Sequence, residues 1–290
     1  MTSYTVAVDD TDAGSRTIEW IDENLRPGDR VRLLTVSELY SETVLRTEQR
    51  LEQAETRLRR RHPGLMVEQS VPEGPTVERL LLDSEDSDVL VLGARQAHVV
   101  LATLGGRIAE RVVARTTVPV VAVPEHWHHG AGPVVVGVDG RTASAALAFA
   151  ADQAAVRGSE LVLVRAWDIP LTISPYANIY LADDRELWEH ESTLELQAAS
   201  RAVADRHPDL DVRAVRRHGQ TATALLDEAG ADASLIVTGR RHRTAIGAFL
   251  GGSVGEALMH RSHAPICIVP QPAAAVPATA SDVPAPAEVH

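Results

Sequence analysis

Two stretches of this sequence decide the fold: Thr5-Val-Ala-Val-Asp9 and Val134-Val-Val-Gly-Val-Asp139. Each is a short β-branched run that ends in an aspartate, and such runs are typical of buried strands in parallel sheets. The two aspartates stand 130 positions apart, and the apolar run at 31–36 returns after the same interval at 161–166. Ordered matches of this kind indicate an internal duplication.

Further matches extend the duplication to nearly the whole chain. The run Arg61-His-Pro-Gly-Leu65 returns as Arg206-His-Pro-Asp-Leu210, and Val118–Pro124 returns as Ala264–Pro270. The second copy therefore carries about 15 additional residues after Ala166. These matches and the composition divide the chain into a first domain at 1–125, a linker at 126–133, a second domain at 134–271, and an Ala- and Pro-rich tail at 272–290 that we expect to be disordered.

Short apolar strands alternate with helices in both copies. In the second copy the spacing of apolar residues predicts helices at Ala143–Val156, Glu186–His207, Thr221–Ala229 and Ser253–Met259. This alternation predicts two α/β domains, each a doubly wound parallel sheet. Sheets of this class bind ligands at the carboxyl ends of their strands, where the strand order reverses.

The composition excludes several classes of protein. The 290 residues include 28 basic and 40 acidic side chains, and the resulting net charge of −12 would repel nucleic acids and anionic membranes. The single cysteine, Cys267, forms no internal disulfide and supplies no cysteine metal cluster. The amino terminus lacks the pattern of a secretory leader, and no uncharged apolar run approaches about 18 residues. We therefore expect a cytoplasmic protein that binds neither nucleic acid nor membrane.

A glycine-containing loop follows the fourth strand of the second copy. It runs from Gly239 to Gly252 and Ser253, directly before the last predicted helix. Glycines let backbone amides approach an anion closely, and the amino end of a helix favours phosphate, although tight turns also require glycine. Asp139, at the end of the first strand of this copy, either caps the following helix or accepts hydrogen bonds from a ribose or an amine.

The tandem repeats and these loops resemble the universal stress protein family in its two-domain form. The family has Gly, two residues, Gly, nine residues, Gly, then Ser or Thr, and this sequence has Gly239, His242, Gly252 and Ser253 at those positions. The resemblance implies Rossmann-like domains, similar to the adenine-nucleotide α-hydrolases and related by a pseudo-twofold axis. It also implies an ATP site, with or without magnesium, in the second domain. The residues that the resemblance places in this site are Gly137, Asp139, Ala166, Gly239, His242, Gly252, Ser253 and Val254.

At His242 the second repeat departs from the family pattern, which has glycine at this position. The side chain of His242 either blocks the approach of the phosphates or is harmless. The neighbouring Arg240, Arg241 and Arg243 either contact a triphosphate or form a solvated basic loop. The first repeat keeps Gly93 and Gly106 but has Gln96 and Arg107 at the other two positions, and Asp10 and Asp12 follow its Asp9. We expect this repeat to bind ATP weakly or not at all and to serve mainly as a packing partner.

Several other residues receive a structural interpretation. We interpret the linker histidines as solvated side chains rather than as a metal site; they are His126, His128 and His129. We expect His260 and His263 to cap the last helix, and Cys267 to be a small buried residue. The inserted segment 168–185 is either a lid over the adenine or a surface loop.

The sequence favours a stress-response protein that binds ATP as a regulatory or sensing ligand, with no enzymatic activity. Two alternatives remain at this stage: an interaction module that needs no nucleotide, and a slow ATP hydrolase. No catalytic or metal-binding residue is assigned, and a protein partner remains unidentified. The resemblance implies association through the last strands, so we expect the strands at 118–123 and 265–269 to pair within one chain, giving either a monomer that imitates a dimer or a subunit of a homodimer.

Overall fold

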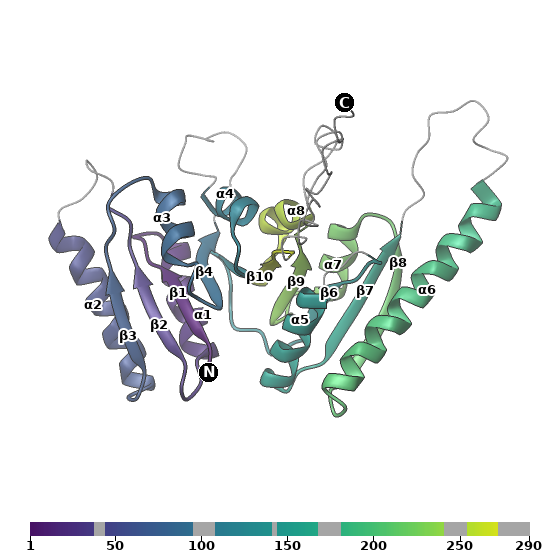
Figure 1. Ribbon diagram of the computed structural model, residues 1–290, viewed down its shortest axis with the longest axis horizontal. Helices are drawn as coiled ribbons and strands as arrows, with labels where there is room; N and C mark the ends of the chain where they lie inside the picture. Colours follow the sequence, from purple (N-terminus) through teal and green to yellow (C-terminus); the bar gives the residue numbers. More distant parts are fainter. Residues whose placement is uncertain (38–43, 95–107, 141–143, 168–180, 241–253, 272–290) are drawn as a thin grey trace, which may run out of the picture.

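A computed structural model describes residues 1–37, 44–94, 108–140, 144–167, 181–240 and 254–271. The strands form one ten-stranded sheet in the order β3-β2-β1-β4-β5-β10-β9-β6-β7-β8, with β5 and β10 between the two halves (Figure 1). The first repeat consists of β1 (Ser3–Ala7), α1 (Asp12–Asn24), β2 (Arg30–Leu34), α2 (Val44–Arg61), β3 (Met66–Ser70), α3 (Thr76–Asp83), β4 (Val89–Ala94), α4 (Ile108–Arg115) and β5 (Val120–Pro124). The second consists of β6 (Val134–Gly137), α5 (Ser144–Arg157), β7 (Leu161–Trp167), α6 (Leu181–Arg206), β8 (Val212–His218), α7 (Thr221–Ala229), β9 (Leu235–Gly239), α8 (Val254–Arg261) and β10 (Ile266–Val269).

The strand order is the same in both repeats and confirms the predicted fold class. Every strand pair within a repeat is parallel, whereas β5 and β10 are antiparallel, with Val121 opposite Cys267. This pairing inside one chain is the one that the sequence predicts. It gives a continuous sheet whose halves are related by a pseudo-twofold axis between β5 and β10.

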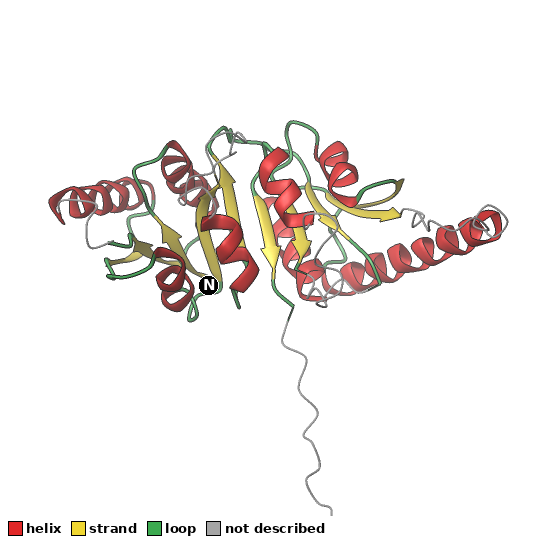
Figure 2. Ribbon diagram, turned by 90° about the horizontal axis from the view of Figure 1, so that it is seen from above, coloured by secondary structure: helices red, strands yellow, loops and turns green. Residues whose placement is uncertain are grey.

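Helices cover both faces of the sheet (Figure 2). On one face α1, α2, α5 and α6 contribute buried side chains such as Ile21, Leu51, Ala150 and Leu196 to a single core. On the other face α3, α4, α7 and α8 contribute side chains such as Leu80, Val112, Leu225 and Leu258. The inner strands β4, β5, β6, β9 and β10 are buried on both sides because helices cover both faces, which explains their runs of apolar residues.

The helix predicted at Glu186–His207 differs in detail. The structure starts α6 at Leu181, five residues before the predicted start, so the last part of the predicted insertion at 168–185 is helical. The rest of that insertion, 168–180, lies outside the described residues, as does the tail at 272–290. Among the described helices, none is both long enough and apolar enough to cross a membrane.

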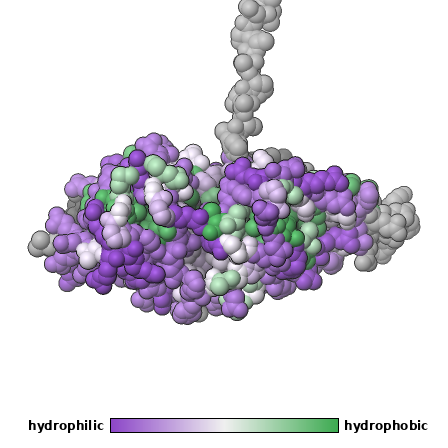
Figure 3. Space-filling view, turned by 90° about the horizontal axis from the view of Figure 1, so that it is seen from below, coloured by the Kyte–Doolittle hydropathy of each residue, from purple (hydrophilic) through white to green (hydrophobic). Residues whose placement is uncertain are grey.

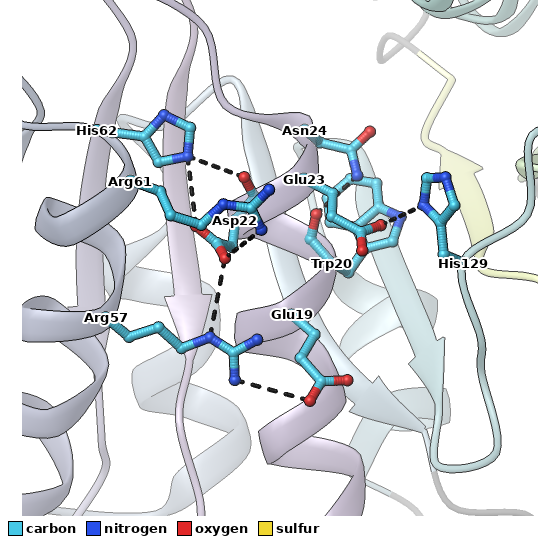
Figure 4. A network of polar contacts seen from close by, with 9 residues as sticks. All are labelled: Glu19, Trp20, Asp22, Glu23, Asn24, Arg57, Arg61, His62 and His129. Carbon is cyan, nitrogen blue, oxygen red and sulfur yellow. Dashed lines mark hydrogen bonds and ion pairs between the residues drawn. The ribbon is translucent and has the colours of Figure 1, made fainter.

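The linker packs against both repeats, while its three histidines, His126, His128 and His129, are exposed, as the sequence predicts. Trp127 is 5% exposed and belongs to the core. The amide of Gly132 donates to the carbonyl of Asp232 at 2.8 Å. His129 Nδ1 lies 2.6 Å from Glu23 Oε2 on α1 (Figure 4). The linker is therefore part of the interface between the repeats.

The repeated Arg-His-Pro motif has a structural explanation. In the first repeat, Arg61 Nη1 donates to the buried Asp22 Oδ2 at 3.0 Å, and His62 Nε2 lies 2.9 Å from the carbonyl oxygen of Asp22 (Figure 4). In the second repeat, Arg206 Nε donates to Asp152 Oδ1 at 2.9 Å, and His207 Nε2 lies 2.7 Å from the same carboxylate oxygen rather than from the carbonyl oxygen. In both repeats the motif connects the carboxyl end of the long helix, α2 or α6, to the first helix, α1 or α5.

Candidate functional site

The sheet brings the predicted site residues of the second repeat to one edge. Gly137 ends β6, Asp139 follows it, Ala166 lies near the end of β7, and Gly239 ends β9. These strands are neighbours in the order β9-β6-β7, and all three are parallel, so their carboxyl ends lie together. Val254 is the first residue of α8. The remaining predicted residues, His242, Gly252 and Ser253, lie outside the described residues.

A cavity of about 410 Å³ occupies the equivalent edge of the first repeat. Its lining includes the counterparts of all the described site residues: Ala7 for Gly137, Asp9 for Asp139, Val36 for Ala166, Gly93 for Gly239, and Ile108 for Val254. A volume of this size falls in the range of small-molecule pockets. This cavity, which is lined by described residues, belongs to the repeat that the sequence presents as the weaker candidate.

Apolar and polar residues both line this cavity, and three of the polar ones, Asp9, Asp10 and Thr11, lie just before α1. Leu34, Leu80 and Leu92 belong to the lining, together with Met259 from α8 of the second repeat. Asp9 Oδ1 accepts hydrogen bonds from the amide and the hydroxyl of Thr11, at 3.0 and 2.6 Å. Thr11 in turn caps α1, and its hydroxyl oxygen accepts from Gly14 N at 3.1 Å.

The second repeat has an ion pair where the first has Thr35 and Arg50. Arg165 on β7 pairs with Glu195 on α6, and it also donates to the carbonyl oxygen of Ala166. Sequence analysis did not identify Arg165 or Glu195 as part of this edge. An arginine inside the apolar run Leu161–Trp167 was the available signal, since a charged residue on a buried strand needs a partner.

The two strand-end glycines differ in what surrounds them. A side-chain carbon at Gly93 would lie 2.8 Å from the backbone carbon of Ala13, closer than real side chains come. A carbon at Gly239 would lie 3.7 Å from Ala146 Cβ, which is an ordinary contact. Neither glycine has a positive φ. Packing thus explains Gly93 but leaves Gly239 without a structural reason among the described residues.

Arg240 has a structural role that the sequence did not predict. Its Nη1 donates to the carbonyl oxygen of Val113, in the last turn of α4, at 2.9 Å. Burial lowers the pKa of this guanidinium. Arg240 therefore joins the second repeat to the first, rather than extending toward a triphosphate.

The remaining candidates are placed as follows. His260, in the last turn of α8, lies 3.6 Å from Glu110 Oε1 on α4 and so forms a second contact between the repeats. Cys267 is fully buried on β10, as expected, and burial raises the pKa of its thiol. In the described part of the chain, no three His, Cys, Asp or Glu side chains gather in a group that would hold a metal ion.

Comparison with known proteins explains this architecture. A model of the universal stress protein family matches residues 4–124 and 131–270. The chain belongs to this family. A universal stress protein of Mycobacterium bovis is 31% identical over 208 residues, and one of Mycobacterium tuberculosis is 29% identical over 197 residues. These alignments cover 69% and 65% of this chain but 65% and 63% of the relatives, so the chain matches slightly less than two thirds of their length.

A solved universal stress protein from Archaeoglobus fulgidus has a similar fold. Its TM-score is 0.64 at 18% identity, over 93% of this chain and 96% of that one. At this identity the likeness concerns the fold alone. It shows that the tandem arrangement of universal stress protein domains extends over nearly the whole length of both chains.

Proposed function

We propose that this universal stress protein binds ATP at the carboxyl edge of β6, β7 and β9, and that the nucleotide is a regulatory ligand in a stress response. One observation carries the proposal: Gly137, Asp139, Ala166 and Gly239 lie at the carboxyl ends of three neighbouring strands, and their counterparts in the first repeat line a cavity. A doubly wound sheet offers ligands this edge, where the strand order reverses.

Gly239 supports the location. Among the described residues, neither packing nor a positive φ requires glycine there, and close approach by a ligand would be a reason for it. Asp139, partly exposed two residues after β6, would accept hydrogen bonds from ribose hydroxyls. Gly252 and Ser253, which precede α8 in the chain, would supply amide and hydroxyl donors for the phosphates.

Regulation fits the described residues better than turnover. The contacts that the structure shows at this edge, such as Arg165 with Glu195, hold elements together. None of the described side chains here forms a pair of nucleophile and base of the kind that catalysis requires. We therefore propose a sensing role, in which a bound nucleotide changes the stability or surface of the second repeat.

The test begins with the nucleotide content of the purified full chain. Denatured protein is analysed by mass spectrometry, and the emptied, refolded chain is titrated with ATP and magnesium by calorimetry. We expect binding in the wild type, loss in Asp139→Asn and Gly252→Val, and retention in Asp9→Asn, the matched change in the first repeat. Binding should also raise the free energy of unfolding by about 2.7 kcal/mol at a hundredfold excess over Kd.

Each contrary result has a defined meaning. Absence of both released and added nucleotide in the folded chain would contradict the proposal and would favour an interaction module that needs no nucleotide. Turnover of ATP above background that disappears in Asp139→Asn would show a slow hydrolase instead of a sensor.

A further inference from the structure

The sheet ends in two edge strands, β3 in the first repeat and β8 in the second (Figure 1). Among the described strands, each of them pairs with one neighbour, so one side of each carries backbone amides and carbonyls that no strand covers. An open edge of this kind can accept a further strand, and proteins commonly protect it with charged side chains. The two edges differ in this protection.

Arginines protect the edge at β8. Arg213 and Arg217 both pair with Glu228 on α7. Arg216 reaches the other face and contacts Glu189 on α6. Antiparallel pairing of β8 with a second β8 would bring the arginines of the two copies together, and like charges on neighbouring strands destabilise a sheet. We therefore do not expect β8 to associate with itself.

The edge at β3 lacks this protection. Its one charged residue is Glu68, which pairs with Arg32 of the neighbouring strand β2 at 3.4 Å. Apolar side chains are exposed at both ends of the strand: Met66 is 52% exposed, and Val71, directly after β3, is 41% exposed. The second repeat has Arg216 at the position of Val71. The first repeat thus exposes apolar groups at its edge.

The hydrogen bonds to β2 show which backbone groups of β3 point outward. Thr35 N donates to the carbonyl oxygen of Ser70 at 3.1 Å, and Ser37 N donates to that of Pro72 at 3.0 Å. Successive residues of a strand point their amides and carbonyls to opposite sides. The residues that alternate with these therefore point theirs away from β2, and they are Val67, Gln69 and Val71.

This outward set is complementary to itself about a twofold axis at Gln69. An antiparallel second copy would then place its Val71 opposite Val67 and its Ser70 opposite Glu68, where the hydroxyl can donate to the carboxylate. The three outward pairs would exchange about six backbone hydrogen bonds. An axis at Glu68 instead would set two carboxylates opposite each other, which disfavours that register.

We propose that the edge of β3 is a self-association surface, at which two copies of this chain join their sheets by antiparallel pairing of residues 67–71. The arrangement is closed, because one patch meets its own copy. The contact is small, so the dimer is weak and reversible, with a Kd on the order of 10–100 µM. This surface lies in the first repeat, and the inference does not depend on nucleotide binding in the second.

Sedimentation velocity on the full chain tests the proposal, over a range from about 1 to about 300 µM that brackets this Kd. We expect a reversible shift from monomer to dimer. Gln69→Pro removes an outward amide and spares the hydrogen bonds to β2, so it should weaken the dimer at least about tenfold. The matched control is Ala214→Pro, at the equivalent outward residue of β8, which should leave the Kd within about twofold.

A second pair of variants tests the register and introduces no proline. Residues directly opposite in an antiparallel pair have Cα atoms about 5.5 Å apart, within the range of a disulfide. Mild oxidation with diamide should therefore link Gln69→Cys into covalent dimers at least about tenfold faster than Ala214→Cys. The native Cys267 is fully buried and does not compete.

Circular dichroism establishes first that each variant is folded. A chain that stays monomeric over the whole concentration range would overturn the proposal. So would a dimer that keeps its affinity in Gln69→Pro, or equal rates of crosslinking in the two cysteine variants. Species that grow beyond the dimer with concentration would show head-to-tail pairing of β3 with β8, and would overturn the closed arrangement.

Discussion

At the scale of single residues, the duplication gives pairs of equivalent positions whose surroundings have diverged. Gly93 is the next-to-last residue of β4 and Gly239 the last residue of β9, yet only Gly93 is in close contact with the first helix of its repeat. Asp22 is buried beneath its arginine and histidine, while Asp152 is partly exposed beside the equivalent pair. Each pair provides an internal control, because one member tests a contact that the other lacks.

The glycine pair yields the first prediction. Gly93→Ala should lower the free energy of unfolding by about 1–3 kcal/mol, since the new methyl group would overlap the backbone of Ala13. Gly239→Ala should change the free energy of unfolding by less than about 0.5 kcal/mol. Urea denaturation measures both, and equal effects would contradict the packing difference. If ATP binds as proposed, Gly239→Ala should still weaken ATP binding despite its normal stability.

The second prediction concerns the acid side of the stability profile. Burial raises the pKa of Asp152, but hydrogen bonds from Arg206 and His207 outweigh it, and the net pKa lies below the ordinary value of 3.8. Because the folded pKa is below the unfolded one, this carboxylate stabilises the fold above the unfolded pKa, and the contribution is lost as the pH falls through the folded pKa. The side chain is 41% exposed, so we expect less than about 1 kcal/mol.

As the pH is lowered from about 5 to about 2, the free energy of unfolding should therefore decrease less in Asp152→Asn than in the wild type. The matched control is Asp205→Asn, an exposed carboxylate on α6, which should retain the wild-type slope. Urea titrations at several pH values measure the slopes. An unchanged slope in Asp152→Asn would mean that the contact with Arg206 and His207 is equally strong with a neutral partner.

At the scale of elements, β5 and β10 join the repeats. Every residue of β5 is buried, and β10 places Cys267 opposite Val121 with its side chain fully covered. Pairing these strands removes two sheet edges that would otherwise be open to other chains. The sheet ends instead at β3 and β8, whose residues are largely exposed.

Cys267 offers a probe of this pairing, which is the third prediction. A thiol reagent should not label native Cys267, because the side chain is buried and the thiolate is disfavoured. Labelling should follow unfolding in urea. The control is Asp205→Cys, which places an exposed thiol on α6 and should react at once. Rapid labelling of Cys267 in native conditions would show that β10 separates from β5.

At the scale of the whole molecule, several contacts join the repeats besides the central strands. Arg240 reaches the end of α4, His129 pairs with Glu23, and Arg157 Nη2 donates to Asn24 Oδ1 at 2.5 Å. Burial lowers the pKa of Arg157 to about 10.

On the face seen from below, hydrophilic residues cover most of the surface and hydrophobic ones gather in small separate patches (Figure 3).

The fourth prediction is that the two repeats unfold together. One sheet and continuous cores on both faces predict a single urea transition, coincident by tryptophan fluorescence and circular dichroism. Arg240→Ala should lower the free energy of unfolding by about 1–2 kcal/mol, because the carbonyl of Val113 loses its donor. The control is Arg201→Ala, which replaces an exposed arginine on α6 and should change the free energy of unfolding little. Two resolved transitions in the wild type would contradict the single cooperative unit.

The amino-acid sequence by itself determined the duplication, the alternation of strands and helices, and the sheet edge at which Gly137, Asp139, Ala166 and Gly239 meet. Local periodicity and an internal repeat suffice for this, because strand order in a doubly wound sheet follows general rules of chain connection. The pairing of the last strands was also predictable, since an apolar edge strand requires a partner.

Only the tertiary structure decided which side chains fill the two equivalent edges. Arg165 meets Glu195, Arg240 meets the carbonyl of Val113, and Met259 enters the cavity of the other repeat, all across long distances in the chain. The glycine motifs give information about the loops alone. They do not predict these contacts, because each contact depends on how helices from separate segments pack on the sheet. The cavity in the first repeat is the result of that packing, in the half whose glycine motif is the weaker of the two.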